Sequence, residues 1–173
     1  MKQNYNALIL KSVKITAGAI LAILFASCLN LKYSATAGII TILSIQNTKK
    51  ETIQTALARG EAFCCALLVS FLCYNFFGYT TTAFGIYLLV FTTLCLTMKW
   101  SSAIAMDSVL ITHFLAEKTM NIPMIANEIS LFLIGAGIGV LLNLSLRPKE
   151  NEWKDKMAEA DESIRSIIKR MAE

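Results

Sequence analysis

Residues 124–146 read MIANEISLFLIGAGIGVLLNLSL, an apolar run with a single charged side chain, Glu128. A helix needs about 20 apolar residues to cross the hydrocarbon core of a bilayer, and this run is long enough. Gly135 and Gly139 are four residues apart, which is the spacing of small residues on a helix face that packs closely against a neighbouring helix. The run therefore predicts a membrane-spanning helix.

The rest of the chain has the composition of a membrane protein. Of its 173 residues, 55% are hydrophobic, which is too apolar for an ordinary soluble domain. Five further apolar segments precede residues 124–146. Of the six segments in chain order, the second and fifth are the least apolar, so we expect them inside the bundle. The sequence thus predicts an all-α integral membrane protein with a bundle of about six transmembrane helices. The predicted spans are Val13–Leu29, Tyr33–Asn47, Ala62–Phe77, Thr81–Met98, Trp100–Ala116 and Met124–Leu146.

Basic residues between these segments predict how the chain crosses the membrane. Lysine and arginine near helix ends are retained on the cytoplasmic side. If the N-terminus is cytoplasmic, Lys32 and Lys118 are the only basic residues near the helix ends that lie on the outer side of the membrane. We therefore predict a cytoplasmic N-terminal segment (1–12), a six-span domain (13–147) and a cytoplasmic helix (148–173), with both termini cytoplasmic. The basic residues predicted inside are Lys2, Lys11, Lys14, Lys49, Lys50, Arg59, Lys99, Arg147 and Lys149.

After Pro148 the sequence changes to KENEWKDKMAEADESIRSIIKRMAE, whose apolar residues alternate at spacings of four and three. This heptad pattern predicts an amphipathic helix with one apolar stripe. The stripe would pack in a homo-oligomer, on the membrane body, or within a larger cytoplasmic domain. Because the pattern still runs at the end, we expect the start of a shortened helical domain. The predicted oligomerisation seam is Trp153, Met157, Ile164, Ile167 and Met171.

Ionisable residues in the fifth and sixth segments are candidates for a transport pathway. Asp107 lies near the middle of the fifth segment, where a carboxylate costs roughly 2.5–3.5 kcal/mol and should face the bundle interior. His113 lies about 9 Å nearer the outer surface, and Glu117 one turn beyond it. The sixth segment descends from that surface, so we expect Glu128 to approach His113. A proton or anion pathway is one interpretation; hydrogen bonding to neighbouring hydroxyls is the other.

The second segment is unusually rich in uncharged polar residues, and a basic stretch follows it. Such a helix suits a substrate path, although interhelical hydrogen bonds of about 0.6 kcal/mol each explain it equally well. The basic residues would draw anions to a cytoplasmic entrance, or act only as determinants of topology. The pathway candidates here are Thr41, Ser44 and Gln46, and the candidate basic entrance is Lys49, Lys50 and Arg59.

Enzymes and nucleic-acid-binding proteins are disfavoured. The chain has one histidine and neither a Gly-x-Ser-x-Gly turn nor a phosphate-binding loop, so no catalytic constellation can be assembled. All five cysteines lie inside apolar runs without a Cys-x-x-Cys pair, and we expect neither a metal nor a cofactor. Basic residues sit at the ends of apolar runs, which indicates membrane topology and argues against a nucleic-acid partner.

The polar second helix and basic stretch, YSATAGIITILSIQNTKKETIQTALARGE from Tyr33, resemble the bacterial aromatic acid exporter family. The six-span body and the Arg147–Pro148 exit into a cytoplasmic helix add to that resemblance. It covers roughly Val13 to Trp153 and extends more distantly to fusaric acid resistance proteins and plant aluminium-activated malate transporters. Members usually continue into a longer cytoplasmic domain, and this chain departs from the pattern by ending at Glu173.

The resemblance implies an exporter of small organic anions such as aromatic carboxylates, working as a homo-oligomer in a bacterial plasma membrane. A carboxylate repels an anion unless it is protonated or paired, so a proton-coupled exporter would use Asp107 as the proton carrier. Two alternatives stay open. One is an anion channel, and the other is a non-transporting scaffold or regulatory protein that acts through its cytoplasmic helix.

Overall fold

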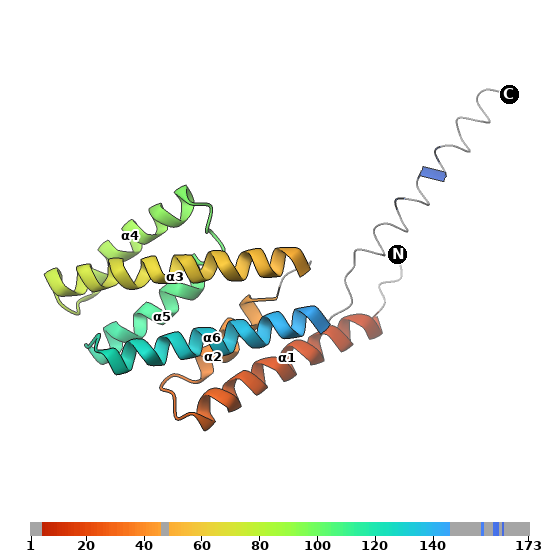
Figure 1. Ribbon diagram of the computed structural model, residues 1–173, viewed down its shortest axis with the longest axis horizontal. Helices are drawn as coiled ribbons and strands as arrows, with labels where there is room; N and C mark the ends of the chain where they lie inside the picture. Colours follow the sequence, from red (N-terminus) through yellow and green to blue (C-terminus); the bar gives the residue numbers. More distant parts are fainter. Residues whose placement is uncertain (1–4, 46–48, 146–156, 158–160, 163, 165–173) are drawn as a thin grey trace.

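The computed structural model describes residues 5–45, 49–145, 157, 161–162 and 164, and it confirms an all-α chain over these ranges (Figure 1). Three of its helices contain segments long and apolar enough to cross a membrane, namely Ile9–Cys28, Glu51–Phe77 and Ile122–Leu144. This is the pattern of a multi-pass membrane protein. The six helices within the described ranges are α1 (Tyr5–Cys28), α2 (Ala35–Leu43), α3 (Lys49–Phe77), α4 (Thr81–Thr97), α5 (Ile104–Glu117) and α6 (Ile122–Ser145).

The helix bounds match the predicted segments closely for α4 and α6 and poorly for α3. That helix begins at Lys49, whereas the predicted span begins at Ala62. The predicted bound followed hydropathy alone. The stretch KKETIQTALARGE is polar, but Lys, Glu, Gln, Ala, Leu and Arg are strong helix formers. Glu51 in the first turn also favours the helix start. Arg59 consequently lies within a helix and not in a loop.

The short helix α2 begins where the backbone turns sharply. Asn30 and Tyr33 have positive φ angles of 53° and 59°, and α2 starts two residues after the second of them. The helix ends after Leu43, where the amide of Ser44 donates to the carbonyl of Ile40 at 2.9 Å. It thus covers part of the predicted segment 33–47, whose residues 46–47 lie outside the described ranges.

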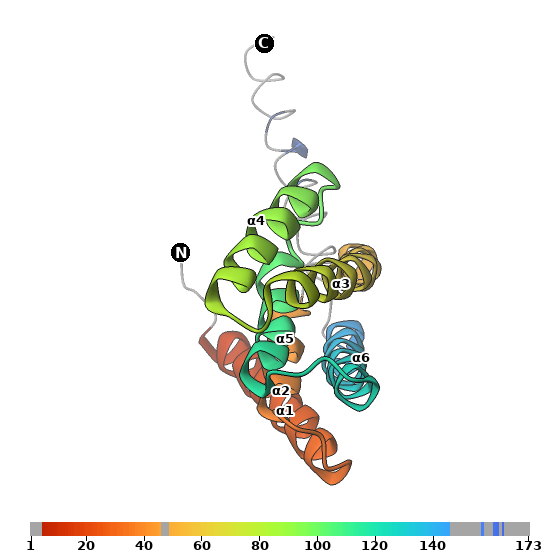
Figure 2. The same ribbon diagram turned by 90° about the vertical axis from the view of Figure 1, so that its left-hand side faces the viewer.

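The helices pack as two groups of three, which Figure 2 shows end-on. Helices α1, α2 and α6 contact one another, as do α3, α4 and α5, and the groups meet where α2 faces α5 and α3 faces α6. The second group has its own core, which includes Tyr87, Phe91 and Phe114. Phe63, Met106 and other residues of the second group belong instead to the core of the first, so apolar packing joins the two groups.

Small residues allow the first group to pack closely, as the sequence predicted. A Cβ atom at Gly135 would lie 2.6 Å from the backbone oxygen of Ala37 in α2. One at Gly139 would lie 2.5 Å from the Cβ of Ser44, and Gly18 of α1 packs directly against Leu142. The glycines are therefore packing faces.

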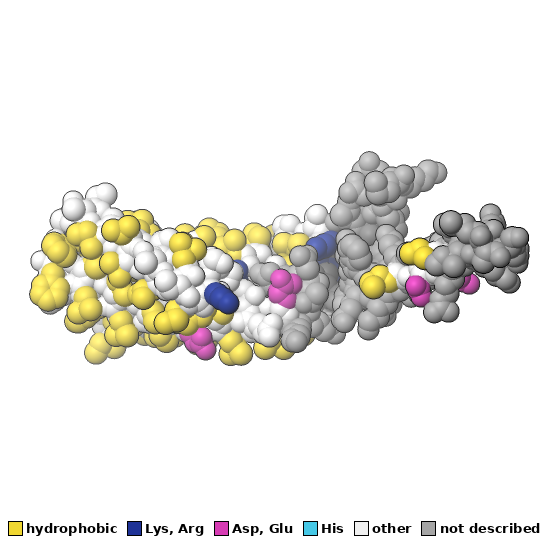
Figure 3. All heavy atoms as spheres, turned by 90° about the horizontal axis from the view of Figure 1, so that it is seen from above, with side chains coloured by type: hydrophobic (Ala, Val, Ile, Leu, Met, Phe, Trp, Pro, Cys, Tyr) yellow, Lys and Arg dark blue, Asp and Glu magenta, His cyan; other side chains and the backbone are white. Residues whose placement is uncertain are grey.

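The outside of the bundle is largely apolar, and the face seen in Figure 3 shows few charged side chains among the described residues. Large side chains such as Leu68 and Phe76 are 67% and 75% exposed. Water would penalise so extensive an apolar surface, whereas lipid tails cover it at no cost. Met157 and Ile164 of the predicted seam are also exposed, and its other members lie outside the described ranges.

Candidate functional site

Two polar clusters lie inside the bundle, at different levels of α5. The outer cluster surrounds His113, and the inner cluster surrounds Asp107. Both side chains are buried, and both clusters include residues from each group of three helices. The clusters therefore lie where the two groups meet.

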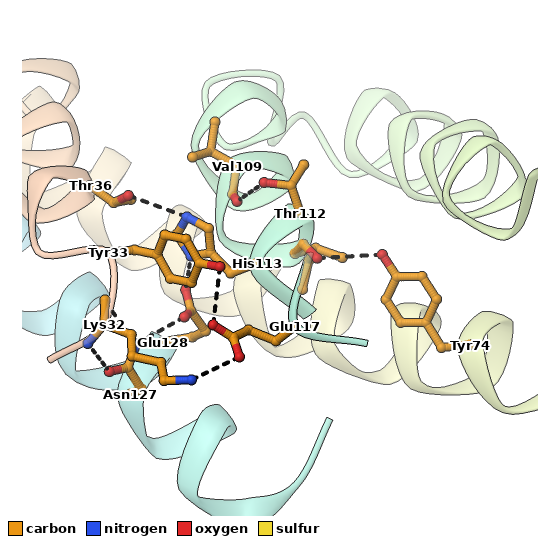
Figure 4. A network of polar contacts seen from close by, with 11 residues as sticks. Lys32, Tyr33, Thr36, Tyr74, Val109, Thr112, His113, Glu117, Asn127 and Glu128 are labelled. Carbon is orange, nitrogen blue, oxygen red and sulfur yellow. Dashed lines mark hydrogen bonds and ion pairs between the residues drawn. The ribbon is translucent and has the colours of Figure 1, made fainter. Parts of the chain in front are cut away.

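In the outer cluster, His113 contacts a residue from each of two neighbouring helices (Figure 4). Its Nδ1 lies 2.7 Å from Oε2 of Glu128 in α6, and its Nε2 lies 3.3 Å from Oγ1 of Thr36 in α2. Glu128 is fully buried, and its other carboxylate oxygen accepts from the side-chain amide of Asn127 at 3.0 Å. The proximity of His113 and Glu128 that the sequence predicted is thus confirmed.

This geometry suits both protonation states of the imidazole. An ionised Glu128 only accepts hydrogen bonds, so Nδ1 of His113 carries a proton. A neutral ring then accepts at Nε2 from the hydroxyl of Thr36, and a charged ring donates to the same oxygen. Both ring nitrogens of His113 therefore have a hydrogen-bond partner in either form of the ring.

A second set of contacts closes the outer end of the bundle over His113. The ring of Tyr33 stacks on the imidazole with centroids 4.0 Å apart and planes 4° apart. Its hydroxyl donates to Oε1 of Glu117 at 3.2 Å, while Lys32 Nζ lies 2.8 Å from Oε2. The backbone N–H and C=O of Lys32 both bond the side-chain amide of Asn127, at 2.8 and 3.1 Å. We call Lys32, Tyr33, Glu117 and Asn127 the outer clasp.

Electrostatics keep the charged pair of the outer clasp ionised. The hydrogen bond to Glu117 raises the pKa of Lys32 above its ordinary range, and the same bond lowers the pKa of Glu117. The backbone is strained at this point, because a left-handed φ is unfavourable for a bulky residue such as Tyr33. Contacts on both sides hold the aromatic ring over His113 in spite of that strain.

In the inner cluster, Asp107 is fully buried, and neither carboxylate oxygen has a hydrogen-bond partner within the described part of the chain. Arg59 of α3 is 5% exposed and interacts electrostatically with Asp107 without forming a direct ion pair. Its Nε donates to the carbonyl of Ser102 at 3.2 Å, and its Nη1 to Oγ of Ser44 at 3.4 Å. A buried cation and a buried carboxylate thus lie near each other with donors and acceptors to spare.

Comparison with known proteins identifies the family. Residues 7–146 match the family described as aromatic acid exporter family member 1. The chain belongs to the aromatic acid exporter family. One similar protein is the uncharacterized protein YqjA of Bacillus subtilis (strain 168), which is 36% identical over 134 residues. That match covers 78% of this chain and 42% of YqjA, so the chain spans less than half the length of its relative. No solved structure matches the chain.

The other predicted site residues of this exporter-family chain lie outside the outer cluster. Thr41 donates toward the carbonyls of Ala37 and Gly135, at 2.9 and 3.0 Å, which favours its interpretation as an interhelical contact. Arg59, a member of the candidate basic entrance, is buried beside the inner cluster. Gln46 lies outside the described residues, as do the side chains of Lys49 and Lys50.

Sequence reasoning missed the outer clasp as a unit. The opposite charges of Lys32 and Glu117 on the same predicted side of the membrane were the available signal. No sequence pattern marked the stacking of Tyr33 on His113, or the hydrogen bond between Asn143 of α6 and Thr52 of α3. Among the described residues, no group of His, Cys, Asp and Glu is arranged to hold a metal ion.

Proposed function

We propose that this chain exports small organic anions such as aromatic carboxylates across a bacterial plasma membrane, with coupling to protons. Family membership suggests the substrate class. The proposal includes six membrane crossings, cytoplasmic termini and a homo-oligomeric assembly. Each of these is an expectation from the sequence.

The observation that carries the proposal is the state of Asp107. An ionisable side chain inside a membrane bundle is costly, and such residues mark ion and proton pathways. Buried polar atoms almost always have a hydrogen-bond partner, so two unpartnered oxygens on one side chain require an explanation. A proton carrier whose partner changes during a transport cycle supplies one.

The outer cluster supports a second station for the proton. His113 lies six residues after Asp107, about 9 Å further along α5. Its contacts to Glu128 and Thr36 suit both the neutral and the charged ring. We propose that a proton moves between Asp107 at the inner level and the His113–Glu128 pair at the outer level.

Contacts between helix ends support the proposed topology. Lys32, predicted outside, bonds Glu117, which follows the fifth predicted crossing, and Asn127, which lies near the start of the sixth. Arg59 bonds Ser102, which lies near the opposite ends of the helices. The polar contacts therefore join residues that the predicted topology puts near the same side of the membrane.

Flux of a labelled aromatic carboxylate in proteoliposomes tests the proposal. We expect benzoate flux that depends on an imposed proton gradient and that Asp107→Asn abolishes while leaving assembly intact. Glu61→Gln is the matched control, because it removes a carboxylate from the exposed surface of α3. Flux that ignores the gradient indicates an anion channel. If vesicles that contain the folded protein show no more benzoate flux than protein-free vesicles, the result contradicts transport.

The scaffold alternative is supported by the exposure of Met157 and Ile164, which are 69% and 55% exposed. Apolar residues at this spacing on a helix indicate a partner for the stripe. If the chain acts through that helix, Ile164→Asp disrupts its assembly in cross-linking experiments, and Asp107→Asn changes nothing measurable.

A further inference from the structure

We propose that the Arg59 guanidinium is the subsite for the carboxylate of the transported anion, and that this carboxylate competes with Asp107 for it. One anion and one proton then bind together. This inference rests on the proposed function, because it assigns the anion-binding group and the sign of the proton coupling.

Arg59 has the geometry of an incomplete anion site. A guanidinium carries five N–H donors in a planar fork that fits a carboxylate. Nε of Arg59 donates to the carbonyl of Ser102, and Nη1 donates to the hydroxyl of Ser44. None of the described residues accepts a hydrogen bond from Nη2. The nearby Asp107 carboxylate has two unpartnered oxygens and still forms no direct ion pair with this guanidinium. Unused donors therefore lie beside unused acceptors.

The basic groups of the outer cluster and the outer clasp are already satisfied. His113 bonds Glu128 through one ring nitrogen and Thr36 through the other. Lys32 is exposed and paired with Glu117. Among the buried side chains of the described residues, Arg59 is thus the permanent cation with donors available to a ligand.

Charge balance sets the sign of the coupling. Asp107 is faced by Arg59 from α3 and by Tyr87 and Cys95 from α4. Two further helices contact α5: α2 contributes no titratable side chain, and Glu128 of α6 bonds His113 and not Asp107. Among the described residues, Arg59 is therefore the single permanent cation of the inner cluster. An ionised Asp107 and an incoming carboxylate repel each other strongly in a medium of low dielectric constant. Binding of the anion consequently favours the protonated form of Asp107.

The coupling has a consequence for transport. If the anion and the proton occupy the inner cluster together, they cross together. Flux is then accelerated by acid on the side from which the anion starts, and not by acid on the opposite side. The opposite dependence would indicate exchange of the anion against a proton.

Equilibrium binding of labelled benzoate to the purified full chain, between about pH 6 and pH 8.5, tests the inference. Benzoate stays ionised throughout this range, as any carboxyl with an ordinary pKa near 4 does. We expect the Kd of the unaltered chain to rise with pH by up to about tenfold per unit. In Asp107→Asn binding should be tight, with a Kd that is independent of pH. In Arg59→Gln binding should weaken by at least about 30-fold.

Further variants separate loss of binding from loss of folding. Arg59→Lys keeps the charge and should restore part of the affinity. The double variant Arg59→Gln, Asp107→Asn removes both buried charges, so it leaves neither uncompensated and should fold without binding benzoate. Lys11→Gln removes a cation from the exposed surface of α1 and should bind normally.

The outcomes distinguish the two proposals. Normal benzoate binding and flux in Arg59→Gln would overturn this inference and leave the exporter proposal standing. A Kd of the unaltered chain that does not change with pH would overturn the coupling. Absence of both binding and flux from the folded, unaltered chain would contradict the exporter proposal, and this inference with it.

Discussion

His113 makes two side-chain hydrogen bonds and one ring contact, all inside the bundle. We expect His113→Phe to keep the stacking on Tyr33 and to lose both hydrogen bonds. Glu128 would then be buried without its imidazole donor, which costs about 1–3 kcal/mol of stability. The measurement is the Tm in detergent, which should fall clearly.

Thr112→Val is the control for this substitution. Thr112 is the neighbouring residue of α5, and among the described residues its hydroxyl bonds the carbonyl of Val109 in the preceding turn. Its loss should change the Tm little. Equal effects of the two substitutions would mean that the His113–Glu128 bond contributes no specific stability.

At the same scale, sequence reasoning located some residues and misplaced others. The approach of Glu128 to His113 follows from the helical rise and from the opposite directions of α5 and α6, both readable from the sequence. The burial of Arg59 does not, because it depends on α3 starting at Lys49 in a polar stretch where hydropathy gives no signal. The stacking of Tyr33 depends on a left-handed backbone conformation that propensities do not favour for tyrosine.

At the scale of elements, Gly135 of α6 allows the close contact between α2 and α6. A Cβ atom at Gly135 would lie 2.6 Å from the carbonyl oxygen of Ala37 and from Cβ of Ile40, so both helices must shift to accept it. We expect Gly135→Ala to destabilise the bundle by about 1–3 kcal/mol. Thermal unfolding in detergent measures the effect.

Gly137, two residues on in the same helix, is the matched control. A Cβ atom there would meet nothing within 4 Å. Alanine also favours a helix over glycine by up to about 1 kcal/mol, so Gly137→Ala should leave the Tm unchanged or raise it. Similar destabilisation by both substitutions would show that the close approach of α2 does not limit stability.

The outer clasp between the α1–α2 connection and α5 should respond to pH in a predictable way. The pKa of Glu117 is lowered from 4.5, so its contribution is present above that value and is lost as pH falls through the lowered pKa. The pKa of Lys32 is raised from 10.5, so its contribution is complete below that value and is lost above the raised pKa. A double-mutant cycle of Lys32→Gln and Glu117→Gln should therefore give the same coupling at pH 6 and pH 9. A coupling that changes between these values would contradict the assignment.

At the scale of the whole molecule, the number of membrane crossings depends on the short helices. Helix α5 has 14 residues, or about 21 Å at 1.5 Å per residue, and α2 has nine. Both are shorter than a hydrocarbon core of about 30 Å. They can complete a crossing because they are packed against other helices, and the connections at their ends can lie below the membrane surface where protein surrounds them.

Cysteine labelling across α5 decides whether it crosses the membrane. Lys99 and Lys118 are exposed and lie before and after this helix. In a background without the native cysteines, we expect Lys118→Cys to react with an impermeant maleimide in intact cells, and Lys99→Cys to react only after permeabilisation. Reaction of both on the same side would make α5 a re-entrant helix. Asp107 would then lie in a helix that enters the bundle from one face and returns to it, and a proton passing from Asp107 to His113 would not cross the membrane.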